Sequence, residues 1–271
     1  MRYLSRETAA LPEGLWSKID AAVVKAARDI MTGRRFLQVF GPLGIGVGEI
    51  TIDDADAVEE VEQDGIITTA GRKYAEIPTL YEGFTLLSKD MERADKAGYP
   101  TDLSKAMAAA ETCALKEEKL IYFGNEKLGY EGLLTAKGVN KMAKKDWSTG
   151  ENAFSDISAA VAMLAEKGLY GPYALVMSTD LYMQLQRLQP GTGLLEIERV
   201  SKLVNGRVYK APVLGKGKAA LVCSDSRNMD LVIGQDMATA YLEQKDLNHS
   251  FRVLETILPR IKRKQAIVVF E

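Results

Sequence analysis

A dense run of carboxylates between two β-forming segments constrains the fold of this chain more than any other feature. Residues 53–64 contain seven acidic side chains, which are Asp53, Asp54, Asp56, Glu59, Glu60, Glu62 and Asp64. The flanking residues 49–52 and 65–69 are rich in β-branched side chains, so we predict a projecting two-stranded arm with a solvated acidic tip. An isolated hairpin is only marginally stable in water, so the arm must pack against something else. The run lacks the glycine and the distant glutamate of an EF-hand loop, which argues against a calcium site.

Around the arm, hydrophobic periodicity predicts helices and strands in mixed order. Helices are expected over 12–31, 103–122, 154–167 and 179–188, and strands over 34–40, 173–178, 207–210, 219–223, 231–233, 239–243, 251–257 and 266–270. This order indicates an α+β chain rather than regular βαβ winding. The apolar stripe of the first helix serves core packing or docks a partner peptide, and the sequence leaves both open. In the second helix, Cys113 is predicted to be a small buried side chain, and the charged run 116–119 a solvated face.

The sequence offers little for catalysis. His249 is its only histidine, so no site with two histidine ligands can form within one chain, and no GxSxG motif precedes it. The glycines of GPLGIGVGE (41–49) match neither common phosphate-loop spacing and predict a flexible turn. We therefore predict that the chain is not an enzyme, with a small cytoplasmic hydrolase as the distant alternative.

The charge balance is close to neutral. Lysine and arginine number 35 against 37 aspartates and glutamates, which excludes the strongly basic footprint of a dedicated nucleic-acid binder. The cluster Arg260, Lys262, Arg263 and Lys264 leaves a local basic patch open. Residues 1–16 contain no apolar signal-peptide core, no apolar stretch is long enough to span a bilayer, and the two cysteines suit a reducing compartment. These features predict a cytoplasmic protein that has no membrane partner.

Five sequence blocks, in order, resemble the encapsulins, which are shell proteins of microbial nanocompartments with the Hong Kong 97-type phage capsid fold. The blocks are GRRFLQVFGPLG (33–44), GFTLLSKDMERADKAG (83–98), NEKLGYEGLL (125–134), GPYALVMSTDLY (171–182) and GQDMATAYLE (234–243). The resemblance implies a self-assembling shell protein that forms an icosahedral cage. A phage or prophage major capsid protein is the alternative within the same fold.

The resemblance also implies how the chain is divided. Residues 1–44 would form an N-terminal helix and arm, and residues 45–82 the extended loop, which packs against a neighbouring subunit. Residues 83–136 and 229–271 would form a peripheral domain around a long spine helix, and residues 137–228 an axial domain. The loop that lines a fivefold pore would comprise Gln189, Pro190, Gly191, Thr192 and Gly193.

In this family the N-terminal helix and nearby C-terminal strands bind a short peptide at the tail of a cargo enzyme, such as a ferritin-like protein or a dye-decolourising peroxidase. The resemblance implies that the docking surface comprises Val24, Ala27, Arg34, Gln38, Leu231, Ile233, Leu254 and Ile257. Gln38 stands where many relatives carry aspartate, so one fixed negative charge is lost there. Lys89 stands where some members carry a tryptophan implicated in flavin stacking, and an ammonium cannot stack on a flavin ring, so no cofactor is expected.

Overall fold

A long central strand organises the first of two larger sheets. The computed structural model describes residues 2–9, 11, 14–54 and 57–271. Strand β13 (Asn248–Ile261) pairs antiparallel with β12 (Ala238–Lys245) and β6 (Thr79–Leu86) along its earlier residues, and with β11 (Met229–Ile233) along its later ones. The short strand β1 (Val39–Phe40) pairs parallel with β11 and completes the sheet.

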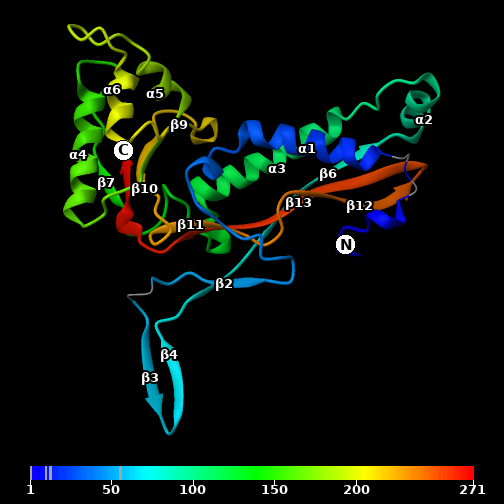
Figure 1. Ribbon diagram of the computed structural model, residues 1–271, viewed down its shortest axis with the longest axis horizontal. Helices are drawn as coiled ribbons and strands as arrows, with labels where there is room; N and C mark the ends of the chain where they lie inside the picture. Colours follow the sequence, from blue (N-terminus) through cyan, green and yellow to red (C-terminus); the bar gives the residue numbers. More distant parts are fainter. Residues whose placement is uncertain (1, 10, 12–13, 55–56) are drawn as a thin grey trace.

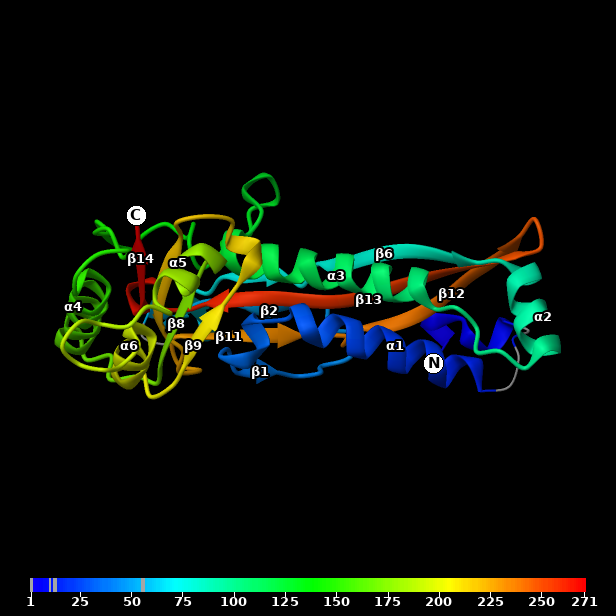
Figure 2. The same ribbon diagram turned by 90° about the horizontal axis from the view of Figure 1, so that it is seen from above.

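Two helices cover one face of this sheet. α1 (Leu15–Ile30) and α3 (Ser104–Phe123) lie side by side along the strands (Figures 1 and 2), and α2 (Ser88–Ala97) joins β6 to α3 at the far end. Buried residues of α1 recur every three or four positions, as in Ile19, Val23 and Ala26, and pack against small residues of α3 above the ring of Phe251. Cys113 is one of these small residues, which confirms the prediction that it is buried.

The second sheet has the strand order β7–β14–β10–β8–β9. Its strands are β7 (Asn140–Met142), β8 (Tyr173–Met177), β9 (Val208–Lys210), β10 (Ala219–Cys223) and β14 (Ile267–Phe270). Helices α4 (Asn152–Glu166), α5 (Thr179–Gln184) and α6 (Glu196–Leu203) lie around it (Figure 2). The last strand differs from expectation. Residues 229–271 were expected to lie together in the peripheral domain. β14 instead belongs to the second sheet, where it pairs with β7 and β10.

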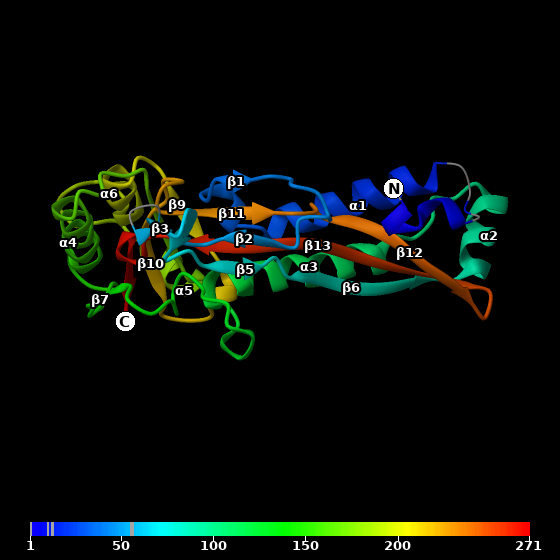
Figure 3. The ribbon, with the colours of Figure 1, turned by 90° about the horizontal axis from the view of Figure 1, so that it is seen from below.

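The acidic arm projects on the side of the first sheet opposite the helices (Figures 1 and 3). β2 (Glu49–Thr51) pairs with β5 (Tyr74–Glu76) at its base, and β3 (Glu59–Gln63) pairs with β4 (Ile66–Ala70) beyond it. Every residue of β3 and β4 is exposed, and the turn between them has positive φ at Asp64 and Gly65, as tight hairpin turns require. The two-stranded arm is confirmed. Its expected pairing is wrong, because residues 49–51 pair with 74–76 rather than with 65–69, and three of the seven carboxylates lie in β3 rather than in the tip. Asp56 lies outside the described residues.

Two segments near α1 and α3 also differ from the sequence-based expectation. Residues 34–40 were expected to be a strand, but Gly33–Arg35 is a 3-10 turn and only Val39–Phe40 pairs in a sheet. The run 116–119 is not a solvated face, because Glu117 and Glu118 are both buried. The two segments meet at Glu118, whose carboxylate accepts hydrogen bonds from the backbone N–H groups of Thr32 and Gly33 in the turn after α1.

Short 3-10 turns complete the structure at Arg2–Leu4, Arg6–Thr8, Glu126–Leu128, Pro212–Leu214 and Lys264–Ala266. α5 ends at Gln184 rather than at the expected residue 188, because the chain turns there to form a bridge between Leu188 and Leu195. Among the helices of the described residues, none combines the length and apolar character that crossing a bilayer requires.

Candidate functional site

A cavity of about 500 Å³ lies between the second half of α1, the turn that follows it and the turn between β11 and β12. Its lining residues are Val24, Ala27, Arg28, Met31, Arg34, Arg35, Asp236 and Met237. Ala27 and Arg28 follow Val24 by three and four residues on α1, and Met31 caps the end of the helix seven residues after Val24, so the four share one face. That face lies beside the one that packs on α3, and it gives the cavity an apolar wall with a charged rim.

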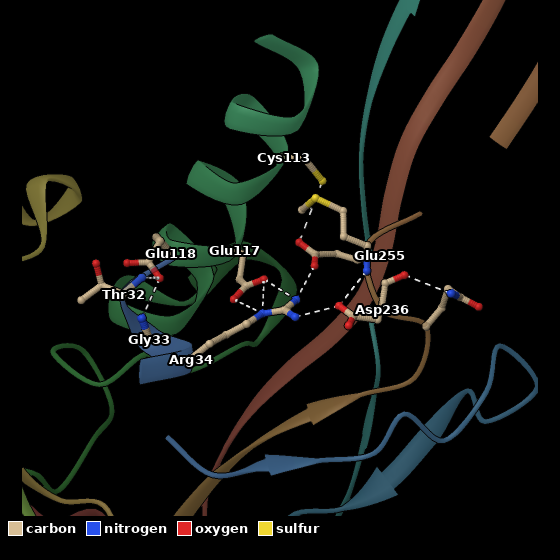
Figure 4. Close-up of polar contacts among 10 residues, drawn as sticks. Thr32, Gly33, Arg34, Cys113, Glu117, Glu118, Asp236 and Glu255 are labelled. Carbon is tan, nitrogen blue, oxygen red and sulfur yellow. Dashed lines mark hydrogen bonds and ion pairs between the residues drawn. The ribbon is translucent and has the colours of Figure 1, made fainter. Parts of the chain in front are cut away.

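Arg34 forms one side of the cavity and ties three elements together (Figure 4). Its Nε donates to Glu117 of α3 at 2.9 Å, one terminal nitrogen donates to Glu255 of β13 at 2.8 Å, and the other donates to Asp236 at 2.7 Å. Glu117 and Glu255 are fully buried, whereas Asp236 is largely exposed. The guanidinium therefore compensates charge that would be costly to bury alone.

Glu118 fixes the chain immediately before Arg34. Its Oε1 accepts hydrogen bonds from the backbone N–H groups of Thr32 and Gly33, both at 2.8 Å. Glycine is favoured at position 33, because a Cβ there would lie 2.5 Å from the Cδ1 of Ile121, which would have to shift. Burial raises the pKa of Glu118 to about 7, an effect that the two backbone donors oppose.

Glu255 lies deeper in the same cluster. Burial and the neighbouring charge of Glu117 hold the pKa of Glu255 well above its usual range, despite the opposing charge of Arg34. The Cys113 thiol lies 3.9 Å from a Glu255 oxygen. Burial, together with the charge of Glu255, raises the pKa of this thiol, so Cys113 is poorly placed to act as a nucleophile.

A break between β11 and β12 directs Asp236 toward Arg34. Thr256 of β13 binds the backbone at this break. Its hydroxyl accepts a hydrogen bond from the Gln235 N–H at 2.6 Å, and its carbonyl accepts one from the Gly234 N–H at 2.9 Å. A Cβ on Gly234 would lie 2.5 Å from that hydroxyl, so glycine is needed for this close approach. The sheet is thereby interrupted, and Asp236 and Met237 reach the cavity.

The structure brings together only part of the docking surface expected from the sequence. Val24, Ala27 and Arg34 line the cavity, whereas Gln38 is exposed in a separate hollow beside Val39 and Phe40. The four strand residues do not line this cavity, and their part in docking stays a prediction. Leu231, Ile233 and Ile257 are buried in the core that continues into the second sheet, and Leu254 packs against Leu4 and Ala240.

Sequence reasoning missed five lining residues, which are Arg28, Met31, Arg35, Asp236 and Met237. A signal for two of them was present, because Arg28 and Met31 follow Val24 and Ala27 by four residues, the spacing of one helix face. The signal for Asp236 and Met237 was weaker, since only their place in the block GQDMATAYLE marked them.

The loop expected to line a pore lies elsewhere, between α5 and α6 at one end of the molecule (Figure 1). Gln189 is buried, while residues 190–193 are exposed. The loop is held in shape by its own hydrogen bonds, because the Gln189 N–H donates to Leu194 at 2.9 Å and the Thr192 hydroxyl donates to the Gln189 carbonyl at 2.9 Å. Positions 188–195 carry no ionisable side chain.

The remaining singled-out residues do not form a catalytic group. His249 is buried with its Nδ1 3.2 Å from the Tyr241 hydroxyl, and burial lowers its pKa. Lys89 is exposed on α2 in a hollow with Glu92, Arg93 and Lys96. Across the described part of the chain, no group of three or more His, Cys, Asp or Glu side chains is placed to hold a metal ion.

Comparisons with known proteins find similarity to shell proteins along most of this chain. A family model described as "Encapsulating protein for peroxidase" (Linocin_M18) matches residues 1–258. The "Type 1 encapsulin shell protein EncA" of Myxococcus xanthus is 40% identical, over 99% of this chain and 96% of that protein. The "Diheme-cytochrome-encapsulin shell fusion protein" of Kuenenia stuttgartiensis is 38% identical, over 94% of this chain and 72% of that protein.

Solved structures with a similar fold include a virus-like particle and a phage capsid. The virus-like particle from Pyrococcus furiosus has a TM-score of 0.76 and 23% identity, and the match covers 95% of this chain and 100% of that one. The capsid of Myoviridae Phage XM1 has a TM-score of 0.64 and 15% identity, and covers 89% and 91%. At these identities the likeness shows the fold alone, and it confirms the capsid fold that the sequence blocks indicate.

Proposed function

The chain belongs to the encapsulin family of shell proteins, and from that premise we propose that the cavity beside Arg34 receives the targeting peptide of a cargo enzyme. As a member of this family the chain is a structural protein that self-assembles into a capsid-like shell, and it is not an enzyme. The observation that supports the cavity as the docking site is its open apolar wall. Val24 is 39% exposed in the middle of a packed helix, beside Met31 and Met237.

The size and chemistry of the cavity suit an extended peptide with apolar anchors. A volume of about 500 Å³ lies in the range of ligand sites, and methionine side chains adapt to varied partners. Each buried leucine-like anchor contributes ~1.5–3 kcal/mol, while an exposed charge pair contributes ~0–1 kcal/mol. Apolar contact therefore dominates the proposed binding, and raising the salt concentration should weaken it little.

Two classes of cargo are proposed for this chain, a peroxidase and a ferritin-like protein. The family description names a peroxidase, and a related protein of Pyrococcus furiosus is described as a "Ferritin-like-encapsulin shell fusion protein". Either enzyme would carry its docking peptide as a tail, and the shell would be the partner that this tail recognises.

The experiment compares two substitutions at equally exposed apolar positions. Val24→Asp places a charge in the cavity wall, and Leu115→Asp places one on α3 outside the cavity, where Leu115 is also 39% exposed. Each shell is co-expressed with a fluorescent protein that carries the tail of the peroxidase or ferritin-like protein encoded beside this gene. We expect fluorescence in shells of the wild type and Leu115→Asp, at low and high salt, and none in Val24→Asp. Loading that survives Val24→Asp would place the docking site elsewhere. Loading that high salt abolishes would contradict binding by apolar contact.

We also propose how the chain is arranged in the shell. Residues 83–136 and 229–266 would form the peripheral domain and residues 137–228 the axial domain, with β14 added to the axial sheet. Residues 189–193 would line an opening on the fivefold axis, which the exposure of residues 190–193 at one end of the molecule supports. The arm would pack on a neighbouring subunit, because Ile66 and Ile67 are 69% and 62% exposed and have no core of their own.

A further inference from the structure

The basic run at the end of β13, residues 260–264, is compensated within the chain. Its four cations lie beside carboxylates of other segments: Arg260 and Lys262 with Asp230, Arg263 with Asp54, and Lys264 with Glu131. A protein that binds a phosphate backbone presents free cations to it. These ion pairs reduce the charge that the run presents to a phosphate backbone.

Two of these cations reach across to the arm. Arg263 holds the Asp54 carboxylate with two hydrogen bonds, from Nε at 2.7 Å and from a terminal nitrogen at 3.2 Å. Arg260 donates to the Thr51 carbonyl at the end of β2, at 3.2 Å. Arg260 is itself fixed, because it is buried, donates to both oxygens of Asp230 at 2.8 and 2.6 Å, and lies over the Phe40 ring.

These contacts fall where the arm changes direction. β2 runs along the first sheet, whereas β3 and β4 point away from it (Figure 1). Before the bend, Ile50 and Ile52 pack against the sheet. The Ile52 N–H donates to the Lys73 carbonyl at 3.0 Å, which joins the outgoing and returning chains of the arm. After the bend, β3 and β4 are exposed along their whole length. Asp54 is thus held at the junction between the anchored part of the arm and the projecting part.

We propose that Arg263 and Asp54, supported by Arg260 on Thr51, form an elbow latch that sets the direction of the arm and thereby the size to which the shell closes. This inference concerns assembly and is independent of the cavity proposed for cargo. Both latch side chains are about three-quarters buried, with exposed fractions of 25% for Arg263 and 23% for Asp54. The two-bond geometry fixes the orientation of the carboxylate as well as its position.

A closed shell amplifies a small change at such an elbow. Loss of a partly exposed ion pair changes the ratio of two arm orientations by up to about fivefold in one subunit. A closed symmetric assembly requires the same interface at every copy, so each subunit with a misdirected arm disturbs closure. The expected result is a mixture of diameters and open fragments rather than loss of the subunit fold.

The test is a charge reversal at the latch. Arg263→Gln and Asp54→Asn each break the pair, and the double variant Asp54→Arg with Arg263→Asp restores it with the charges exchanged. Lys264→Gln is the matched control, since it removes the next cation of the run, whose partner Glu131 lies outside the arm. Shells of each variant are examined by sedimentation velocity and electron microscopy, and the subunit fold by circular dichroism.

We expect a broadened sedimentation boundary and several diameters for each single variant, and one diameter for the wild type, for Lys264→Gln and for the reversed pair. If Arg263→Gln does not fold, Asp54→Asn decides, because it keeps the size of the side chain. Shells of the wild-type diameter in the folded single variants would overturn the latch. Equal broadening in Lys264→Gln, or a reversed pair that stays as heterogeneous as the single variants, would overturn it as well.

Discussion

Replacing Glu118 with glutamine is expected to remove a pH dependence of stability that this one carboxyl imposes on the subunit. The side chain accepts hydrogen bonds from Thr32 and Gly33 through a single oxygen, Oε1, and a glutamine carbonyl can accept the same two bonds. The substitution therefore preserves the turn after α1 and removes only the titration. Glu111→Gln, at an exposed position of the same helix, is the matched control.

The magnitude follows from the pKa. Burial raises the pKa of Glu118 from 4.5 to about 7, so the folded state favours the protonated form. For a pKa raised on folding, the stabilisation is complete below the pKa of the unfolded chain and is lost as the pH rises through that of the folded chain. A shift of this size corresponds to about 3 kcal/mol of unfolding free energy, lost between pH 4.5 and pH 7.

Urea unfolding at a series of pH values, followed by tryptophan fluorescence at one protein concentration, measures the effect. Relative to wild type, Glu118→Gln should gain about 3 kcal/mol between the acid and the neutral end of this window. Glu111→Gln should follow the wild-type curve throughout. A constant difference between wild type and Glu118→Gln at every pH would refute the assignment of this titration to Glu118.

Further outcomes follow from other contacts. Arg34→Met should lower the unfolding free energy by ~3–5 kcal/mol, because it leaves two buried carboxyls without their cation, and urea midpoints check this. Gly33→Ala should cost ~1–3 kcal/mol through its clash with Ile121, and a compensating Ile121→Val should recover part of it. Thr192→Asp should speed the entry of a divalent cation into intact shells, as followed by a dye held inside, if its loop lines an opening; an unchanged rate would contradict that role. Purified shells should lack a flavin absorbance band, since Lys89 offers no stacking surface; a band that survives gel filtration and is lost on mutation around Lys89 would show otherwise.

The elements most accurately predicted from sequence were those with strong local patterns. The long helix was expected over 103–122 and spans Ser104–Phe123, because small and apolar residues recur at helical spacing along its length. The strand expected over 219–223 is β10, an uninterrupted apolar run buried in the second sheet. The arm was recognised as a hairpin, but its register was not, since β-branched residues occur in both limbs and the pairing depends on the turn at Asp64 and Gly65.

The site was less predictable because its determinants are distant in sequence. Glu117 follows Arg34 by 83 positions and Glu255 follows it by 221, so nothing local indicates which cation compensates these carboxylates. A solvated face and a buried cluster look alike until the partner cation is placed beside them. Likewise, the sequence of the strands that contain Leu231 and Ile257 does not show that both side chains are buried in the core, because the second sheet that packs beyond them is formed by distant segments.

The account depends most on closure of this chain into a shell through its arm. Sedimentation velocity of the purified protein at micromolar concentration, with electron microscopy of the same sample, tests this most directly when the wild type is compared with a variant that lacks residues 53–64. We predict closed particles of many copies with negligible monomer for the wild type, and a folded but unclosed or irregular assembly for the deletion. A wild-type protein that sediments as a monomer, or a deletion variant that closes normally, would contradict the account.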